Sequence, residues 1–319
     1  MITEETQEKI LSLKDAIANH PADSALYVDL GFAHFEAEQF EVALAAFRQA
    51  LALNPAAAAA HNGSGRVYER LGDAQAALGA YNEAIALDPT KIPPYIGLGI
   101  IYLDQLGNYE AAATAFGNGL MYHPDDPFAL ALLGNTYAHM GRFEDAIQMF
   151  QRAIHLEPTH DFALSNLSLV YLHLGQWAKM IDSCQRELAI ADDAEPRRLL
   201  GYVYNRLGQY EDAVAQLERS VALNPADYEA RGALSRVYRK LGRDSAADAQ
   251  YTQANALAAQ DNEYGQACFA AVTDDLEKAL TLLAIALTKG QVRPAWVRID
   301  PEFAFIQAEA RFQALLTGS

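Results

Sequence analysis

The sequence predicts an all-α protein made of stacked helix-turn-helix repeats, and three observations support this. Alanine, leucine, glutamate and glutamine are abundant while valine and threonine are sparse, a composition that favours helix. Apolar, alanine-rich stretches end repeatedly at proline. These prolines lie at intervals of 34, 35, 34 and 67 residues, at Pro55, Pro89, Pro124, Pro158 and Pro225. A repeat of this length is typical of a helical array.

Three further series of residues run in phase with the prolines. Small residues occupy Gly31, Gly65, Gly99, Gly134, Ser168, Gly201 and Ser235. Three residues after each comes a ring, at His34, Tyr68, Tyr102, Tyr137, Tyr171, Tyr204 and Tyr238. The third series is Ala43, Ala77, Ala112, Ala146, Met180, Ala213 and Ala247. The agreement of these registers predicts seven helical hairpins.

Each residue type has a physical role in such a hairpin. A glycine such as Gly72 or Gly141 ends the first helix, because glycine readily adopts the left-handed cap conformation. Small residues let the two helices approach closely, and the rings fill space toward the next hairpin. Proline ends the second helix because it lacks the amide donor. One hairpin cannot bury its apolar face alone, so the hairpins must stack.

At these residues the sequence resembles the tetratricopeptide repeat family, which implies a right-handed α-solenoid of stacked repeats. The resemblance covers residues 24–259 as seven repeats, and residues 260–293 resemble a degenerate eighth. Residues 1–23 then form an N-terminal capping helix, and residues 294–319 a C-terminal capping segment, since terminal repeats need covering. A detachable, partner-binding helix is the alternative for the last segment.

Two repeats depart from the pattern. The third has one extra residue between Leu103 and Asn108, which predicts a longer turn between its helices. The fifth carries Met180, Cys184 and Glu187 and is one residue short. We expect a bend or looser packing there, and we interpret it as a packing irregularity rather than a functional hinge.

In the family that this chain resembles, the first helix of each repeat lines a concave groove that binds a peptide or protein. Carried over by register, the candidate groove residues are Arg66, Arg70, Phe128, Asn135, Phe162, Asn166, Leu169, Arg198, Tyr202, Asn205, Arg206, Arg236, Arg239 and Lys240. The middle repeats are apolar, and the sixth and seventh are basic.

The basic end of this groove suggests an acidic partner. Arginine can bind a carboxylate through two hydrogen bonds, so we expect an acidic segment or a free carboxy terminus near Arg198, Arg236 and Arg239. The alternative is that these arginines pair with the protein's own acidic residues. A subclass of the family binds chaperone tails through a carboxylate clamp. Asn135 and Asn166 match its asparagines, but its basic positions hold other residues.

The composition argues against several other functions. A net charge of −17 repels nucleic acid and anionic membranes. The acidic start of the chain predicts no secretory signal, the longest apolar runs are too short to cross a bilayer, and two widely separated cysteines fit a reducing cytoplasm. No phosphate-binding loop, catalytic motif or metal-ligand spacing is present, so we expect no enzyme activity, cofactor or metal.

The sequence therefore predicts a cytoplasmic scaffold or adaptor for protein–protein interaction. Two alternatives stay open. One is a structural protein that self-assembles by placing an end helix of one copy in the groove of another. The other is a regulator that responds to a small molecule bound in the groove.

Overall fold

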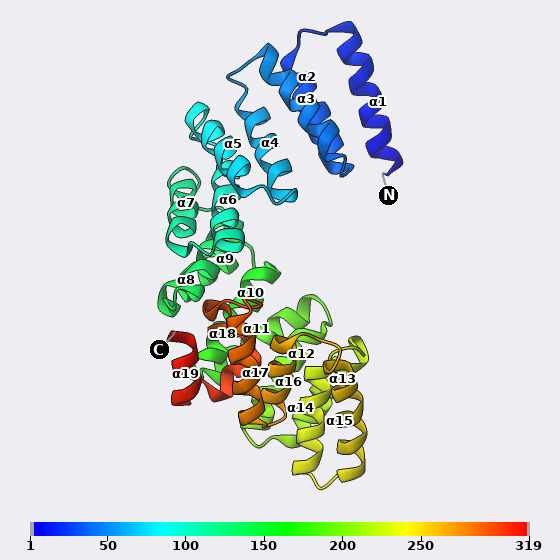
Figure 1. Cartoon of the computed structure of the whole chain (residues 1–319), viewed down its shortest axis with the longest axis vertical. Helices are drawn as coiled ribbons and strands as arrows, with labels where there is room; N and C mark the ends of the chain where they lie inside the picture. Colours follow the sequence, from blue (N-terminus) through cyan, green and yellow to red (C-terminus); the bar gives the residue numbers. More distant parts are fainter. Residues whose placement is uncertain (1–2, 318–319) are drawn as a thin grey trace. The chain divides into compact units, whose positions relative to one another are not determined.

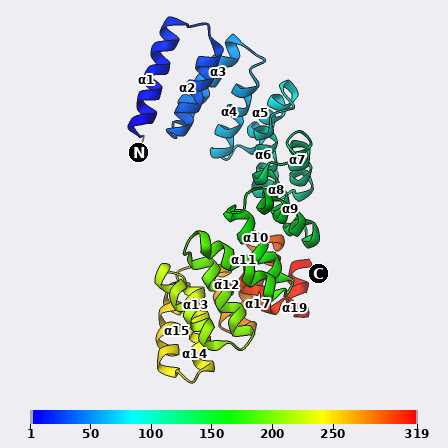
Figure 2. The same ribbon diagram turned by 180° about the vertical axis from the view of Figure 1, so that it is seen from behind.

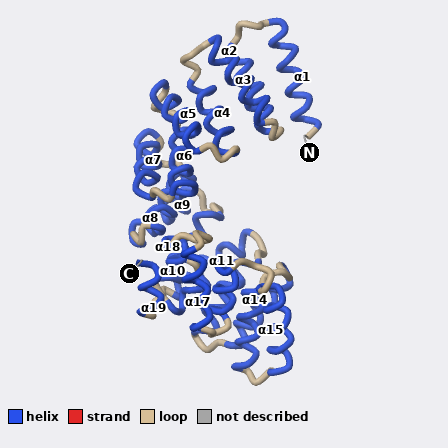
Figure 3. Tube along the Cα trace, viewed as in Figure 1, coloured by secondary structure: helices blue, strands red, loops and turns tan. Residues whose placement is uncertain are grey.

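The computed structural model describes residues 3–317 as α-helices joined by short turns, with no strand in that range (Figure 1, Figure 3). The helices form two compact units, the first ending at Thr136 and the second beginning at Tyr137. Within each unit, consecutive helices pair as hairpins and the hairpins stack. The predicted fold class, an all-α solenoid of helical repeats, is confirmed.

The first unit begins with a single helix, which precedes the hairpins. Its elements are α1 (Glu4–Asn19), α2 (Ser24–Glu36), α3 (Phe40–Leu53), α4 (Ala58–Arg70), α5 (Ala74–Leu87), α6 (Ile92–Ile100), the π-helix η1 (Ile101–Leu106), α7 (Tyr109–Tyr122) and α8 (Pro127–His139), which runs across the boundary.

The second unit ends in three short helical segments. Its elements are α9 (Phe143–Leu156), α10 (Asp161–His173), α11 (Trp177–Ile190), α12 (Ala194–Arg206), α13 (Tyr210–Leu223), α14 (Tyr228–Lys240), α15 (Asp244–Ala258), α16 (Glu263–Val272), α17 (Leu276–Thr288), α18 (Pro294–Ile299), the 3-10 helix η2 (Pro301–Ile306) and α19 (Ala310–Thr317). Figure 2 shows the same elements from behind.

Short polar and glycine residues set the helix ends. The Asp73 carboxylate accepts a hydrogen bond from the backbone N–H of Ala76 at 3.0 Å and so caps α5. Gly72, just before it, has a φ of +75°, which few residues other than glycine adopt. These contacts let two antiparallel helices follow each other across a turn of a few residues.

Aromatic residues of the second helix of a hairpin hold successive hairpins together. The Phe47 ring of α3 is fully buried and lies against Gly31 of α2 and Gly63 of α4. A Cβ atom at either glycine would overlap that ring. Tyr81 repeats the arrangement one hairpin later. The small residues thus make room for an aromatic ring between the first helices of two successive hairpins. The sequence predicts only that they let the two helices of one hairpin approach closely.

The extra residue of the third repeat lies within a helix. The prediction of a longer turn was wrong: Ile101–Leu106 forms a π-helix, and only Gly107 and Asn108 separate it from α7. A π-helical turn holds one more residue than an α-helical turn, so it absorbs an insertion without changing the loop.

The fifth repeat is tightly packed, which contradicts the expected looser packing. Met180 and Cys184 of α11 are both fully buried. Cys184 stands where Phe47 and Tyr81 stand in earlier repeats. Beside it, the Glu187 carboxylate accepts hydrogen bonds from the hydroxyls of Ser165 and Ser168, each at 2.6 Å. Hydroxyl–carboxylate contacts therefore take the place of a ring packed on glycine.

Candidate peptide-binding groove

The C-terminal segment of the second unit lies against helices that are distant in sequence. Residues of η2 contact both α10 and α16, and α18 also contacts α10, beside which Figure 1 shows it. Val297, Phe303 and Phe312 are completely buried in a core that they share with α16 and α17. The segment expected to cap the array thus also reaches the helices expected to line the groove.

Arg198 of α12 binds a carboxylate of this segment. Its guanidinium forms an ion pair with Glu302, and only 11% of the Arg198 side chain and 7% of the Glu302 side chain are exposed. Arg198 Nη2 also lies 2.6 Å from Glu195 Oε2, and Nε lies 3.5 Å from Asp227 Oδ2. A predicted groove arginine is therefore paired within the chain, by its own helix and by the C-terminal segment.

Tyr202 and Phe305 extend this contact along α12. The Tyr202 hydroxyl donates to Glu302 Oε1 at 3.2 Å and accepts from Arg198 Nη1 at 3.1 Å. The half-buried Phe305 ring lies 6.1 Å from the ring of Trp177 and 6.5 Å from that of Tyr202, with the Arg206 guanidinium 5.6 Å from its centroid. Such a cation over an aromatic face is attracted to it.

Carboxyl groups outnumber cations in this part of the second unit. The Tyr264 hydroxyl donates to the Asp300 carboxylate. Burial raises the pKa of Asp300 to about 6, although Tyr264 and Arg198 oppose the rise. Burial likewise raises the pKa of Glu229 to about 7.

Two buried histidines, His139 of α8 and His173 of α10, contact the C-terminal segment. The His139 ring lies 5.2 Å from the Trp296 ring, and burial lowers the pKa of His139 to about 4. Burial also lowers the pKa of His173, which hydrogen-bonds to the backbone of Arg298. Among residues 3–317, no three His, Cys, Asp or Glu side chains are grouped closely enough to hold a metal ion.

The basic residues of α14 line an open pocket of about 340 Å³. Arg236, Arg239 and Lys240 contribute its positive charge, and Tyr251 and Asp274 complete the wall. Arg236 is held in place: Nη1 lies 2.7 Å from Asp274 Oδ1, and the side chain is only 20% exposed. Arg239 lies over the Tyr251 ring at 5.7 Å and is 56% exposed.

Asn205 links the two basic parts of the groove. With its amide oriented to suit its neighbours, the Asn205 oxygen accepts from Arg236 Nη2 at 2.9 Å. Phe162, Asn166 and Leu169 lie along α10, where the Asn166 amide donates to the Phe162 carbonyl of its own helix at 2.7 Å. In a carboxylate clamp the side-chain amide of this asparagine would donate to the ligand. Here one of its N–H groups donates to its own helix instead.

The first unit holds the remaining predicted groove residues. Arg66 lies 4.4 Å from the Phe35 ring centroid, and Arg70 Nη2 lies 3.0 Å from Glu38 Oε1. Phe128, with 46% of its surface exposed, and Asn135 lie on α8. Both arginines therefore contact neighbouring repeat residues.

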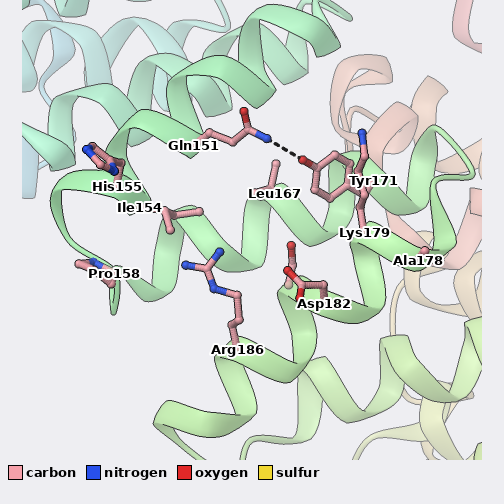
Figure 4. A pocket seen from close by; sticks show the side chains of 11 residues that line it. Gln151, Ile154, His155, Pro158, Leu167, Tyr171, Ala178, Lys179, Asp182 and Arg186 are labelled. Carbon is pink, nitrogen blue, oxygen red and sulfur yellow. Dashed lines mark hydrogen bonds between the residues drawn. The ribbon is translucent and has the colours of Figure 1, made fainter.

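A second hollow lies outside the predicted groove, between α9 and α11. Its volume is about 700 Å³, and Figure 4 shows Arg186 and Asp182 among the side chains that line it and Gln151 directed at Tyr171. Gln151 Nε2 donates to the Tyr171 hydroxyl at 3.0 Å. The cleft is mixed in charge, because Arg186 and Lys179 line it together with Asp182.

Sequence reasoning missed the contacts of Glu302 and Phe305 with the predicted groove residues of α12, and the contact of Trp177 with Phe305. The aromatic residues around Asp300 and Pro301 are visible in the sequence, but they predict only a cap. The sequence feature that could have indicated this contact is the acidic residue three positions before an aromatic one. It lies in a segment long enough to fold back onto α12.

No helix within residues 3–317 combines the length and apolar character needed to cross a bilayer.

Known proteins share this fold at low sequence identity. A chain of the APC/C hetero-tetramer Cut9–Hcn1 superposes with a TM-score of 0.59 at 23% identity, covering 73% of this chain and 46% of that one. PilF of Pseudomonas aeruginosa gives a TM-score of 0.58 at 16% identity, covering 71% and 99%. The pilus biogenesis factor PilW gives 0.57 at 18% identity, covering 63% and 94%. At such identities, the likeness shows the fold alone.

The repeats themselves match family models. Five models, each described as a tetratricopeptide repeat, match residues 28–92, 69–136, 127–160, 163–198 and 194–237. A search of curated proteins found no match. Since these models follow one another along most of the hairpins described above, the chain belongs to the tetratricopeptide repeat family.

Proposed function

We propose that this protein is a non-catalytic scaffold that binds an acidic segment or a carboxy terminus of a partner protein in the pocket of α14. The observation that carries the proposal is the gathering of Arg236, Arg239 and Lys240 around one pocket in a chain of net charge −17. Guanidinium groups suit carboxylates, because their fork of donors matches the two carboxylate oxygens.

Arg236 and Arg239 have different roles in the proposed site. Arg236 is half-buried and fixed by Asp274 and by the Val272 carbonyl, so it forms the floor. Arg239 is more exposed, and its contact with Asp248 at 3.2 Å lies on the surface, where an ion pair is worth only about 0–1 kcal/mol. A partner carboxylate can therefore compete for Arg239.

Other observations favour a protein partner. The chain that superposes in the Cut9–Hcn1 hetero-tetramer is itself part of an assembly with a second protein. The strong negative charge of this chain disfavours nucleic acid. The proposed location is a reducing compartment such as the cytoplasm, in keeping with two cysteines that are both free and buried.

Charge reversal tests the proposal. We use a fluorescent peptide of four glutamates with a free carboxy terminus, and measure its affinity for the wild type and for Arg239→Glu/Lys240→Glu. We expect at least tenfold weaker binding to the variant and a steep loss of wild-type binding with salt. The matched control is Arg219→Glu/Arg243→Glu, which reverses two charges at residues that contact Asp192 and Glu211 outside the pocket.

The opposite result is equally clear. Equal affinity of all three proteins for the peptide, or binding that salt leaves unchanged, would show that the pocket does not recognise carboxylates. If the peptide binds the wild type, a version with an amidated carboxy terminus distinguishes an acidic segment from a free carboxy terminus as the ligand. A site for a free carboxy terminus should bind the unmodified peptide more tightly than the amidated one.

A further inference from the structure

The C-terminal segment makes, within the chain, the kind of contacts that a groove ligand would make. Glu302 places a carboxylate on Arg198 and Tyr202, two residues of α12 that the repeat register assigns to the groove. Phe305 places an aromatic ring against Tyr202 and Arg206 of the same helix. An acidic group and a ring thus fill adjacent positions on the inner side of one repeat.

The spacing of these two residues follows from the helix that carries them. Pro301–Ile306 is a 3-10 helix, in which side chains three residues apart point in the same direction. Glu302 and Phe305 are three apart, so both face α12. Phe303, between them, instead packs 5.6 Å from the Phe312 ring in the core with α16.

The contact with α12 is polar and is surrounded by excess negative charge. Arg198 is shared by Glu195, Asp227 and Glu302, and Asp300 also lies nearby. Buried ion pairs contribute little net stability, because desolvation offsets most of the attraction. An incoming segment that brings the same two groups would replace the contacts of Glu302 and Phe305, and its other contacts would have to offset the lost burial of Phe303.

We propose that residues 300–306 are an internal ligand of this groove. The groove recognises an acidic residue followed three positions later by an aromatic residue, and a partner protein that carries such a segment binds by displacing residues 300–306. This inference rests on the proposed function and adds the recognition motif and the built-in competitor.

The competition has a quantitative consequence. A tethered segment acts at an effective concentration on the order of 1 mM, so a free peptide offering only the same contacts binds the intact chain weakly. A partner gains if it also reaches the neighbouring pocket of Arg239 and Lys240, since the two contacts then act together. The internal segment therefore favours partners with both features.

The test uses a fluorescent synthetic peptide with the sequence of residues 299–307 and measures its anisotropy with the full chain. In the double variant Glu302→Gln/Phe305→Ala, the internal segment loses its two contacts while the groove side keeps Arg198, Tyr202 and Arg206. We expect the peptide to bind the double variant at least tenfold more tightly than the wild type. The control is Glu309→Gln, an exposed residue of the same segment, which should bind as the wild type does.

Two outcomes would overturn the inference. Equal peptide affinity for the wild type and the folded double variant shows that the internal segment does not compete. A peptide carrying the same Gln and Ala substitutions that binds the double variant as well as the parent peptide does shows that the motif is not recognised.

A second measurement covers the case in which the double variant does not fold. In the wild type, excess peptide should speed hydrogen exchange of the amides of Asp300 and of residues 302–306 at least threefold, because displacement exposes them. Unchanged exchange overturns the inference. Binding of the four-glutamate peptide stays a separate readout: if Arg239→Glu/Lys240→Glu abolishes it and residues 300–306 stay protected, the proposed function holds and this inference fails.

Discussion

The Arg198 guanidinium is bound by the Glu302 carboxylate, and both side chains are almost fully buried, at 11% and 7% exposure. Arg198 is the one cation in direct contact with Glu195, Asp227 and Glu302 within the described residues. It therefore compensates several acidic groups at once. Its removal has consequences for stability that can be measured separately from binding.

Arg198→Ala should destabilise the second unit by about 3–5 kcal/mol, because it leaves buried carboxylates without a counter-charge. Trp177 and Trp296, the two tryptophans of the chain, both belong to the second unit, so tryptophan fluorescence during urea unfolding reports on that unit.

Arg197→Ala is the matched control. Arg197 precedes Arg198 on α12 but pairs with Asp192 and donates to Gln216 at 2.8 Å. Its loss should cost about 1 kcal/mol or less, as for other pairs near the surface. If the two variants lose the same free energy of unfolding, Arg198 contributes no more to stability than an arginine paired near the surface.

The stabilising contribution of Asp300 to the second unit should fall as the pH rises from 5 to 7.5. The pKa of Asp300 is raised from 3.8 to about 6, so the folded state binds its proton more tightly than the unfolded state does. The stabilisation is complete below about pH 4 and is lost as the pH passes 6. A shift of this size corresponds to at most about 3 kcal/mol.

Asp300→Asn should remove part of this pH dependence, since asparagine does not titrate and can still accept from the Tyr264 hydroxyl. The charged groups near Asp300 are Arg198, Glu195 and Glu302, and all are kept in the variant. Urea midpoints at pH 5 and 7.5 measure the effect, with the exposed Asp182→Asn as control. A variant whose midpoint changes with pH as much as that of the wild type would contradict this assignment.

Local rules predicted the hairpins well, because capping glycines, helix-ending prolines and small residues act within a few positions of themselves. The docking of the C-terminal segment escaped prediction for a different reason. Tyr202 and Glu302 lie 100 residues apart, and no local period records which distant surface a segment covers. The basic groove residues were recognisable as carboxylate binders, but the sequence left open whether the carboxylate would come from this chain.

The third repeat shows a second limit. One inserted residue can lengthen a turn or widen a helix, and the residues Ile101–Leu106 suit either outcome. The choice depends on packing against neighbouring helices, which local sequence does not reveal. The Phe47 ring between Gly31 and Gly63 shows the same limit. The sequence contains Phe47, but its contact with two hairpins at once depends on how the hairpins pack.

Gly63→Ala should destabilise the first unit by about 1–3 kcal/mol, because the new Cβ atom would overlap the buried Phe47 ring and force the helices apart. Gly79→Ala is the matched control on α5: nothing lies within 4 Å of its Cβ position. That variant should instead gain about 0.5–1 kcal/mol, since alanine favours helix over glycine. Thermal unfolding followed by far-ultraviolet circular dichroism compares the two, and a neutral Gly63→Ala would refute the close ring contact.

Both thiols should resist modification while the chain is folded. Cys184 is fully buried and Cys268 is 4% exposed, and burial raises the pKa of each thiol. Because the thiolate is the reactive form, a disulfide reagent should react at least about a hundredfold more slowly in native buffer than in 6 M guanidinium chloride. Ala308→Cys, at an exposed position of the C-terminal segment, supplies a fast-reacting control in the same protein. Rapid native labelling of Cys184 would show that the fifth repeat opens readily, and would return the functional hinge to consideration.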